Sequence, residues 1–426
     1  MPRMGIWTPL SVIIDKKNMK KIMSLTLLAM LSTSALAQQT ITVNVKNPAA
    51  QSKESAPVVV SLKDVNFPVK SALVELKGVE VPCQLDDLDK DGTNDELCFV
   101  TPMGKKEQKS FTVTLYPTGK PRQYTPRVYN EMLLPNKKVK EKNKQDIYIS
   151  CLTYDHGGPS YSVQHHHGVA FESELTCFRI YFDARQSIDL YGKRHKQLEL
   201  KETQFYPDKQ QLAAGYGDDV LWAGNTFALG AFRGWDGKQQ QPLEKVEHRT
   251  QRIISNGPVR SVVEVLDDQW EADPTKEPID VKLRYTIWAG HRDVDVDAFF
   301  RQNVNGYKFS TGVIRVKGST EYNDHKGLRG CWGSDWAVAE KDSAGHVRET
   351  VGLGIYIPKP YMLEEIPTTT DELPFVIGTT GNHLRYHITF CSDKEDFGYH
   401  NAKDWFAAMQ NWRKEIDTPV EVSVKK

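Results

Sequence analysis

Short segments in which apolar and polar residues alternate recur along the first third of the chain. They cover residues 41–45, 58–62, 71–76, 97–100 and 110–115. Alternation with a period of two is the pattern of half-buried strands, and the gaps hold the Pro, Gly, Asn and Asp that turns require. The pattern predicts a small N-terminal β-sandwich over residues 38–126.

The same alternation continues in a longer region after residue 146. Its segments are 178–182, 228–232, 251–254, 259–266, 281–288, 294–301, 311–316, 352–357 and 384–390. No helical pattern recurs between them, which disfavours parallel βαβ winding. We therefore predict an all-β protein whose residues 146–426 form a large antiparallel β-supersandwich.

One segment near the C-terminus has a helical period. In residues 402–416, Trp405, Phe406, Met409 and Trp412 recur at spacings that share one helix face. We expect a C-terminal helix that packs on the sandwich. Residues 127–145, rich in Lys, Asn and Glu, have little apolar patterning and are predicted to be a linker.

The N-terminus has the features of an export signal. Lys16, Lys17, Lys20 and Lys21 precede an apolar stretch at 22–31, and an Ala-Leu-Ala cleavage pattern at 35–37 precedes Gln38. We expect residues 1–37 to be a signal peptide, with translation starting at Met19, and a periplasmic or secreted mature protein. No later segment reaches the roughly 20 apolar residues of a membrane span.

Charge and motifs exclude several classes of function. Lys and Arg number 55 against 55 Asp and Glu, so the net charge is +0, and no long basic block suggests a nucleic-acid partner. No P-loop, dinucleotide fingerprint or nucleophile elbow is present, so we expect no organic cofactor.

The chain has six Cys, all in the part expected to be exported, where disulfides are permitted. The sequence alone does not choose among the possible pairings. Cys83 and Cys98 flank one acidic loop and are the first expected pair. Isolated buried thiols remain the alternative for the others.

That acidic loop places carboxylates at alternate positions before and after Gly92, a pattern that turns hard oxygen ligands inward for Ca²⁺. The candidate ligands are Asp87, Asp89, Asp91 and Asp95. It is not an EF-hand, because Cys98 stands at the twelfth position and no helical pattern flanks the loop. A structural Ca²⁺ site and a solvated acidic turn both remain open.

The stretch 154–236 concentrates aromatic residues beside Gly, with Asp, Arg and His between them. Sugar rings stack on aromatic faces, and their hydroxyls need polar partners, so we expect a carbohydrate-facing cleft here. Trp residues that anchor the sandwich interior are the alternative. The expected substrate-binding residues are Tyr216, Asp219, Trp222, Arg233, Trp235 and Asp236.

Elimination from a uronate requires a cation for the carboxylate, a base for the proton and an acid for the leaving oxygen. If residues 165–167 are extended, His165 and His167 point to one side. They could then act as bases or, together with Asp155 or Glu172, bind a metal ion. The candidate catalytic residues are His165, His167, Tyr161, Arg179, Tyr191 and Lys193.

A glycoside hydrolase would instead need two facing carboxylates. Many are available, and the sequence does not select a pair among Glu172, Glu174, Asp183, Asp189, Asp218, Asp219 and Asp236. The third hypothesis for the function is a protein that binds glycans without catalysis.

Seven motifs lie at residues 84–89, 95–97, 167–172, 179–183, 189–193, 217–222 and 256–260. Together they resemble domain-of-unknown-function family 4861, found in polysaccharide-utilisation loci of Bacteroidota. The larger region is also similar to the supersandwich of galactose mutarotases and several polysaccharide lyases. The resemblance implies an exported glycan-degrading system; with the chemistry above, we expect β-elimination on pectin-like uronate glycans.

Overall fold

The structure is a computed structural model that describes residues 38–158, 160–344 and 346–426. The expected signal peptide, residues 1–37, lies outside the described residues. Residues Thr40–Lys426 form one compact unit. In the described part of the chain, no helix is long and apolar enough to cross a membrane.

The first region is a β-sandwich, as the alternation predicts. One sheet has the order β29-β1-β7-β3-β4, and the other has the order β2-β6-β5. Residues such as Val43, Val58, Phe99 and Phe111 fill the space between the sheets. The strands are β1 (Gln39–Lys46), β2 (Lys53–Ser61), β3 (Ser71–Leu76), β4 (Val79–Val81), β5 (Cys83–Asp86), β6 (Glu96–Met103), β7 (Gln108–Tyr116) and β29 (Glu421–Lys425).

The last strand of the chain belongs to this first sandwich. In β29, Val424 lies opposite Val43 of β1, and the two strands run antiparallel. The predicted larger domain, residues 146–426, therefore ends before its predicted boundary, because its final strand completes the N-terminal sheet.

The larger region is built on a nine-stranded sheet in the order β11-β18-β19-β20-β21-β28-β25-β24-β23. Its neighbouring strands pair antiparallel throughout, which confirms the predicted class. The strands are β11 (Cys151–Asp155), β18 (His248–Asn256), β19 (Arg260–Trp270), β20 (Ile279–Trp288), β21 (Asp293–Phe300), β23 (Thr320–Asn323), β24 (Leu328–Trp336), β25 (Arg348–Tyr356) and β28 (His383–Ser392).

Two five-stranded sheets share the core of this region with the large sheet. The first, β15-β14-β13-β12-β8, comprises β8 (Val128–Glu131), β12 (Gly168–Ser173), β13 (Cys177–Tyr181), β14 (Ile188–Gly192) and β15 (Asp218–Asp219). The second, β17-β16-β22-β27-β26, comprises β16 (Arg233–Trp235), β17 (Gln240–Gln241), β22 (Phe309–Ile314), β26 (Met362–Glu365) and β27 (Glu372–Ile377). Residues on β12, β13 and β14 are buried at every position.

Short elements complete the described chain. They are β9 (Leu133–Leu134), β10 (Ile147–Tyr148), η1 (Lys142–Lys144), η2 (Ser160–Ser162), α2 (Leu200–Thr203), α3 (Lys209–Ala213) and η3 (Glu340–Asp342).

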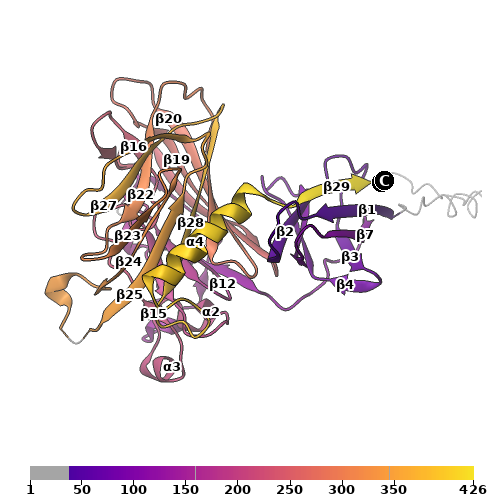
Figure 1. Ribbon diagram of the computed structural model, residues 1–426, viewed down its shortest axis with the longest axis horizontal. Helices are drawn as coiled ribbons and strands as arrows, with labels where there is room; N and C mark the ends of the chain where they lie inside the picture. Colours follow the sequence, from indigo (N-terminus) through magenta and orange to yellow (C-terminus); the bar gives the residue numbers. More distant parts are fainter. Residues whose placement is uncertain (1–37, 159, 345) are drawn as a thin grey trace, which may run out of the picture. The chain divides into compact units, whose positions relative to one another are not determined.

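The predicted C-terminal helix is α4 (Ala402–Asp417), which lies along β24 and β25 in Figure 1. The Asn401 side chain caps its first turn by accepting from the Asp404 amide. Trp405 and Met409 are buried beneath it. A Cβ at Gly352 would lie 2.8 Å from the Trp405 ring, so a glycine there lets the helix approach the sheet closely.

The predicted linker, residues 127–145, contains strand β8, which pairs with β12. The Asn130 side chain is buried and donates to the Ser255 carbonyl at 2.6 Å and to the Ser261 hydroxyl at 2.7 Å. The sequence pattern did not predict strand β8, because the segment has few apolar residues and its Asn130 makes the buried contacts through a polar amide.

The predicted Cys83–Cys98 disulfide is wrong. Cys83 lies opposite Phe99, whereas Cys98 lies opposite Gln84, so the two thiols point to opposite faces of the same sheet. The Cys98 thiol donates to Asp86 at 3.6 Å, and all six Cys are free.

Candidate functional site

Three neighbouring strands bring one guanidinium and two carboxylates together. Arg179 on β13 lies opposite Asp189 on β14, and β14 pairs with β15, which carries Asp219. Arg179 Nε and Nη2 donate to Asp189 Oδ2 at 2.9 and 2.5 Å, and Nη2 also donates to Asp219 Oδ2 at 3.1 Å. Charge-assisted bonds of this kind fix the orientation of all three groups.

Aromatic rings surround this ionic group. The Tyr181 hydroxyl donates to Asp189 Oδ2 at 2.7 Å, and the Tyr206 hydroxyl accepts from Arg179 Nη1 at 3.4 Å. Tyr161 stacks on the His167 imidazole with 4.0 Å between ring centroids, and its ring meets that of Tyr181 edge-on at 5.3 Å. The name "Arg179 cluster" is used below for Tyr161, His167, Arg179, Tyr181, Asp189, Tyr206 and Asp219.

The Arg179 cluster has a buried floor and an accessible rim. Arg179, Tyr181 and Asp189 are buried. The Asp219 side chain is 29% exposed, and Tyr161 is 38% exposed. A solvent-borne molecule can therefore reach the rings and one carboxylate of the cluster, while the guanidinium is held from beneath.

Burial is the main cause of the altered protonation of two rim groups. It lowers the pKa of His167, aided by the Arg179 charge, so the imidazole is neutral near pH 7. Its Nδ1 donates to the Tyr161 carbonyl at 2.7 Å, which leaves Nε2 as the proton acceptor. Burial, and then the Asp189 charge, raise the pKa of Asp219 well above its ordinary value against the opposing effect of Arg179.

The His triplet is a turn rather than the extended segment that the sequence suggests. His167 has a φ of +66°, and the buried His166 donates from Nδ1 to the Gly168 carbonyl at 2.8 Å. Simple alternation of faces therefore does not apply. His165 still reaches the cluster, because its ring lies edge-on to Tyr206 at 5.3 Å, and burial lowers the pKa of His165 to about 4.

Three predicted site residues are buried away from solvent. The Lys193 ammonium pairs with Glu172 and donates to the carbonyls of Ser173 and Gln197 at 2.6 and 2.7 Å. Tyr191 and Arg233 are also buried, and Arg233 donates to the Phe232 carbonyl at 2.9 Å. We therefore no longer assign these three residues to substrate contact.

The predicted sugar-binding residues divide between two places. Trp222 is 48% exposed in the loop after β15. This loop comes close to the Arg179 cluster, because Arg185 donates to the Gly224 carbonyl at 3.5 Å and lies 5.3 Å over the rings of both Tyr161 and Tyr181.

The other predicted residues make local contacts elsewhere. Trp235 is on β16 of a different sheet, and the exposed Asp236 accepts from the amides of Lys238 and Gln239 at 2.8 Å in its own turn. The Tyr216 hydroxyl donates to Glu202. In the described chain, no hydrogen bond, ion pair or ring contact joins these residues to the Arg179 cluster.

Tyr206, a member of the Arg179 cluster, and Arg185, which lies beside the cluster, were not among the predicted residues. Arg185 is in the loop between β13 and β14, and charged residues are common in surface loops. Tyr206 follows the short helix α2, and only the tertiary fold brings it to Arg179. The Arg179–Asp189 pair could have been found, because two strands joined by a short turn place these residues opposite each other.

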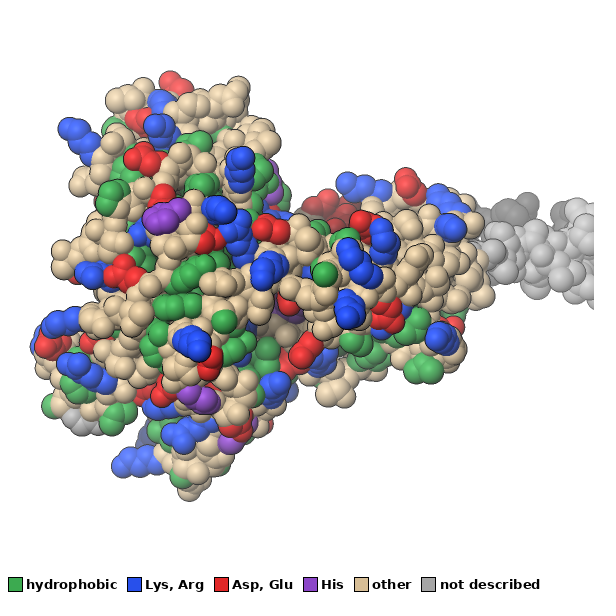
Figure 2. Space-filling view, viewed as in Figure 1, with side chains coloured by type: hydrophobic (Ala, Val, Ile, Leu, Met, Phe, Trp, Pro, Cys, Tyr) green, Lys and Arg blue, Asp and Glu red, His purple; other side chains and the backbone are tan. Residues whose placement is uncertain are grey.

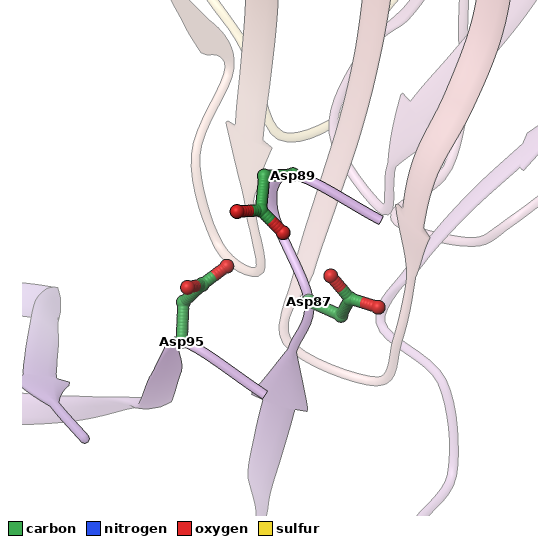
Figure 3. A group of neighbouring side chains, drawn as sticks. All are labelled: Asp87, Asp89 and Asp95. Atoms are coloured by element: carbon green, nitrogen blue, oxygen red, sulfur yellow. The ribbon is translucent and has the colours of Figure 1, made fainter. Parts of the chain in front are cut away.

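The acidic loop of the first sandwich brings three of its four predicted ligands together (Figure 3). One ligand oxygen from each of Asp87, Asp89 and Asp95 lies within 4.8 Å of the others. Asp91 is outside this group, and its carboxylate accepts from the Thr93 amide at 2.7 Å. The oxygen-only donor set suits Ca²⁺, and Ca²⁺ binding by this loop stays a prediction.

The space-filling view in Figure 2 shows acidic and basic side chains interspersed over the visible face. This distribution agrees with the balanced charge of the sequence.

The fold and site thus define an all-β protein of two sandwiches with an Arg-carboxylate-aromatic cluster on one sheet. The chain belongs to the family described as domain of unknown function (DUF4861), which matches residues 45–422. This finding confirms the family resemblance of the motifs. No curated protein matches the chain.

Two solved structures from Enterococcus faecalis are similar to the chain. One is a protein in the glycosyl hydrolase family 38, with 11% identity and a TM-score of 0.45 over 96% of this chain and 50% of that one. The other is an alpha-mannosidase of strain V583, with 10% identity and a TM-score of 0.41 over 96% of this chain and 49% of that one. The chain spans about half the length of each of these two structures.

Proposed function

We propose that the protein is a carbohydrate-active enzyme that cleaves uronate-containing glycans by β-elimination at the Arg179 cluster. The observation that carries the proposal is the contact network itself. It joins a neutral imidazole, a guanidinium and protonated phenols, which are the base, cation and acid that this reaction requires.

In the proposed step, His167 Nε2 takes the proton from the carbon next to the substrate carboxylate. The released electron pair forms a carbon-carbon double bond as the neighbouring carbon-oxygen bond breaks. Tyr206 protonates the leaving oxygen, since its hydroxyl accepts from Arg179 and keeps its own proton to donate. Burial raises the pKa of Tyr206, so this proton is present at neutral pH.

Arg179 is the group that neutralises the substrate carboxylate. Asp219 is the more exposed of its two carboxylate partners and has the longer contact, 3.1 Å against 2.5 Å. Because the pKa of Asp219 is raised, it protonates readily, and a substrate carboxylate can then take its place beside Nη2.

One observation favours retaining glycoside hydrolysis as the second candidate. Asp189 and Asp219 both accept from Arg179 Nη2, so their bonded oxygens are no farther apart than the sum of those two contacts. That limit is below the about 6.5–9.5 Å of inverting enzymes and permits the about 5–5.5 Å of retaining ones. The raised pKa of Asp219 suits an acid-base residue.

Incubation of the purified protein with polygalacturonate and other acidic plant glycans separates the two reactions. Elimination gives an unsaturated uronate that absorbs ultraviolet light, whereas hydrolysis gives reducing ends without this absorbance. We expect absorbance to rise with the wild-type protein and with Asp236→Asn, an exposed control outside the cluster, and to be lost with His167→Gln.

Two outcomes would contradict elimination. Reducing ends without absorbance, abolished by Asp219→Asn, would establish hydrolysis. Glycan binding without turnover on any substrate would make the protein a binding protein. Both measurements require the variants to keep the wild-type melting temperature.

We also infer that the protein is exported, on the basis of the charged, apolar and small-residue segments of 1–37. N-terminal sequencing of the protein from cell fractions tests this inference. A mature chain that begins at Gln38 outside the cytoplasm is the expected result, and an intact N-terminus in the cytoplasm would contradict it.

A further inference from the structure

We propose that the N-terminal β-sandwich carries a second glycan-binding site, specific for a neutral sugar. The site is a pocket of about 420 Å³ between the loop after β2 and the acidic loop before β6. This volume is within the usual range for small-molecule sites, about 300–1,000 Å³. The proposal does not depend on the reaction at the Arg179 cluster.

Hydrogen bonds between the two loops give the pocket a fixed shape. The Leu62 amide donates to the Asp95 carbonyl at 2.8 Å, and the Asn94 side chain donates to the Val69 carbonyl at 2.8 Å. The Lys70 ammonium donates to the Gly92 carbonyl at 3.4 Å. Because both loops are tied at several points, a ligand need not order them when it binds.

The lining has the composition that a pyranose requires. Phe67 is half-buried and packs against the sandwich core, which holds its ring in place as a stacking surface. The side chains of Lys63 and Asn66 are exposed at the pocket, and no described residue bonds to the ammonium of one or the amide of the other. These donors remain available for sugar hydroxyls.

The charge of the lining selects against acidic sugars. Asp91 and Asp95 line the pocket with Lys63 as the single cation among the lining residues. When the acidic loop holds no Ca²⁺, a uronate carboxylate would approach two like charges, whereas the hydroxyls of a neutral sugar can donate to both carboxylates. The pocket therefore differs in specificity from the Arg179 cluster, for which we propose an acidic sugar.

Calorimetric titration of the full mature protein, in buffer with chelator, with galacto-, xylo- and cello-oligosaccharides tests the site, with oligogalacturonate as the acidic comparator. We expect at least one neutral series to bind and Phe67→Ala to weaken this binding tenfold or more. Because Phe67 packs on the core, Asn66→Ala and Lys63→Ala serve as second variants that leave the fold intact. Val79→Ala, exposed in the same sandwich, is the matched control.

The result that overturns the proposal is absence of binding to all three neutral series, or neutral binding that none of the pocket variants weakens. Tighter binding of oligogalacturonate than of any neutral series, weakened by Asn66→Ala, would also overturn the stated specificity. His167→Gln, which tests the proposed reaction, should leave neutral binding unchanged, so failure of one proposal is distinguishable from failure of the other.

Discussion

His291 is the centre of a pH-dependent contact whose strength can be worked out from the structure. Its Nε2 lies 2.6 Å from the Ser55 carbonyl, and its Nδ1 lies 3.0 Å from Asp293 Oδ1. Both partners are acceptors, so both ring nitrogens must carry protons and the ring is an imidazolium. Burial alone lowers the pKa of His291, but Asp293 and the Ser55 carbonyl outweigh it and raise that pKa to about 9.

The sign and size of the effect follow from this shift. The folded pKa is above the ordinary value of 6.5, so the stabilisation is complete below pH 6.5 and is lost as pH rises through about 9. A pKa shift of this size corresponds to a contribution of about 3 kcal/mol to the free energy of unfolding. Because the His291 side chain is 20% exposed, solvent screening reduces this contribution to about 2–3 kcal/mol. For a chain of this length, roughly 3 °C in melting temperature is expected.

The assay is the melting temperature of the wild type and of His291→Gln between pH 6 and pH 10. The difference between the two proteins should shrink by roughly 3 °C as pH rises, because only the wild type loses a charge at this site. The exposed His400→Gln is the control and should parallel the wild type. A constant difference between wild type and His291→Gln across this range would refute the reasoning.

Three further predictions concern other sites. Lys193→Met leaves Glu172 buried without its cation and should destabilise the protein by about 3–5 kcal/mol in urea denaturation. Adding Glu172→Leu to this variant should recover part of the lost stability. An unchanged free energy of unfolding in Lys193→Met would contradict the burial of the pair. Ca²⁺ should raise the melting temperature of the wild type, and chelator should reverse this rise. The effect should be lost in Asp87→Asn and Asp95→Asn and kept in Asp91→Asn. No effect of Ca²⁺ on the wild type would indicate a solvated acidic turn. Arg179→Lys keeps the positive charge but loses the two-nitrogen contact with Asp189, so turnover should fall tenfold or more while the protein still folds. Unchanged turnover would remove Arg179 from the proposed mechanism.

Much of the fold could be predicted because strand alternation is a local property. The predicted segments overlap strands β1, β2, β3, β6 and β7 of the first sandwich, eight strands of the larger region, and the helix that carries Trp405 and Met409. Residues 228–232, which were also predicted to be a strand, form only isolated bridges at Ala228 and Leu229. Strands β12 and β14 were not predicted, because they are buried at every position and therefore show no alternation. Strand β8 was missed because its buried Asn130 is polar, and a period-two apolar pattern does not register an amide whose partners are far away in sequence. The predicted disulfide failed because pairing depends on register, which places Cys83 and Cys98 on opposite faces.

The sequence by itself determined the all-β class, the strands with a clear alternation and the C-terminal helix, since each depends on residues close together in the chain. Only the tertiary structure decided which charged side chains are accessible. Arg179, Lys193 and Arg233 read alike in the sequence, yet Lys193 and Arg233 are enclosed by the core, and Arg179 lies beneath an accessible rim. That difference depends on how separate strands and loops pack over each residue, and no local pattern contains it.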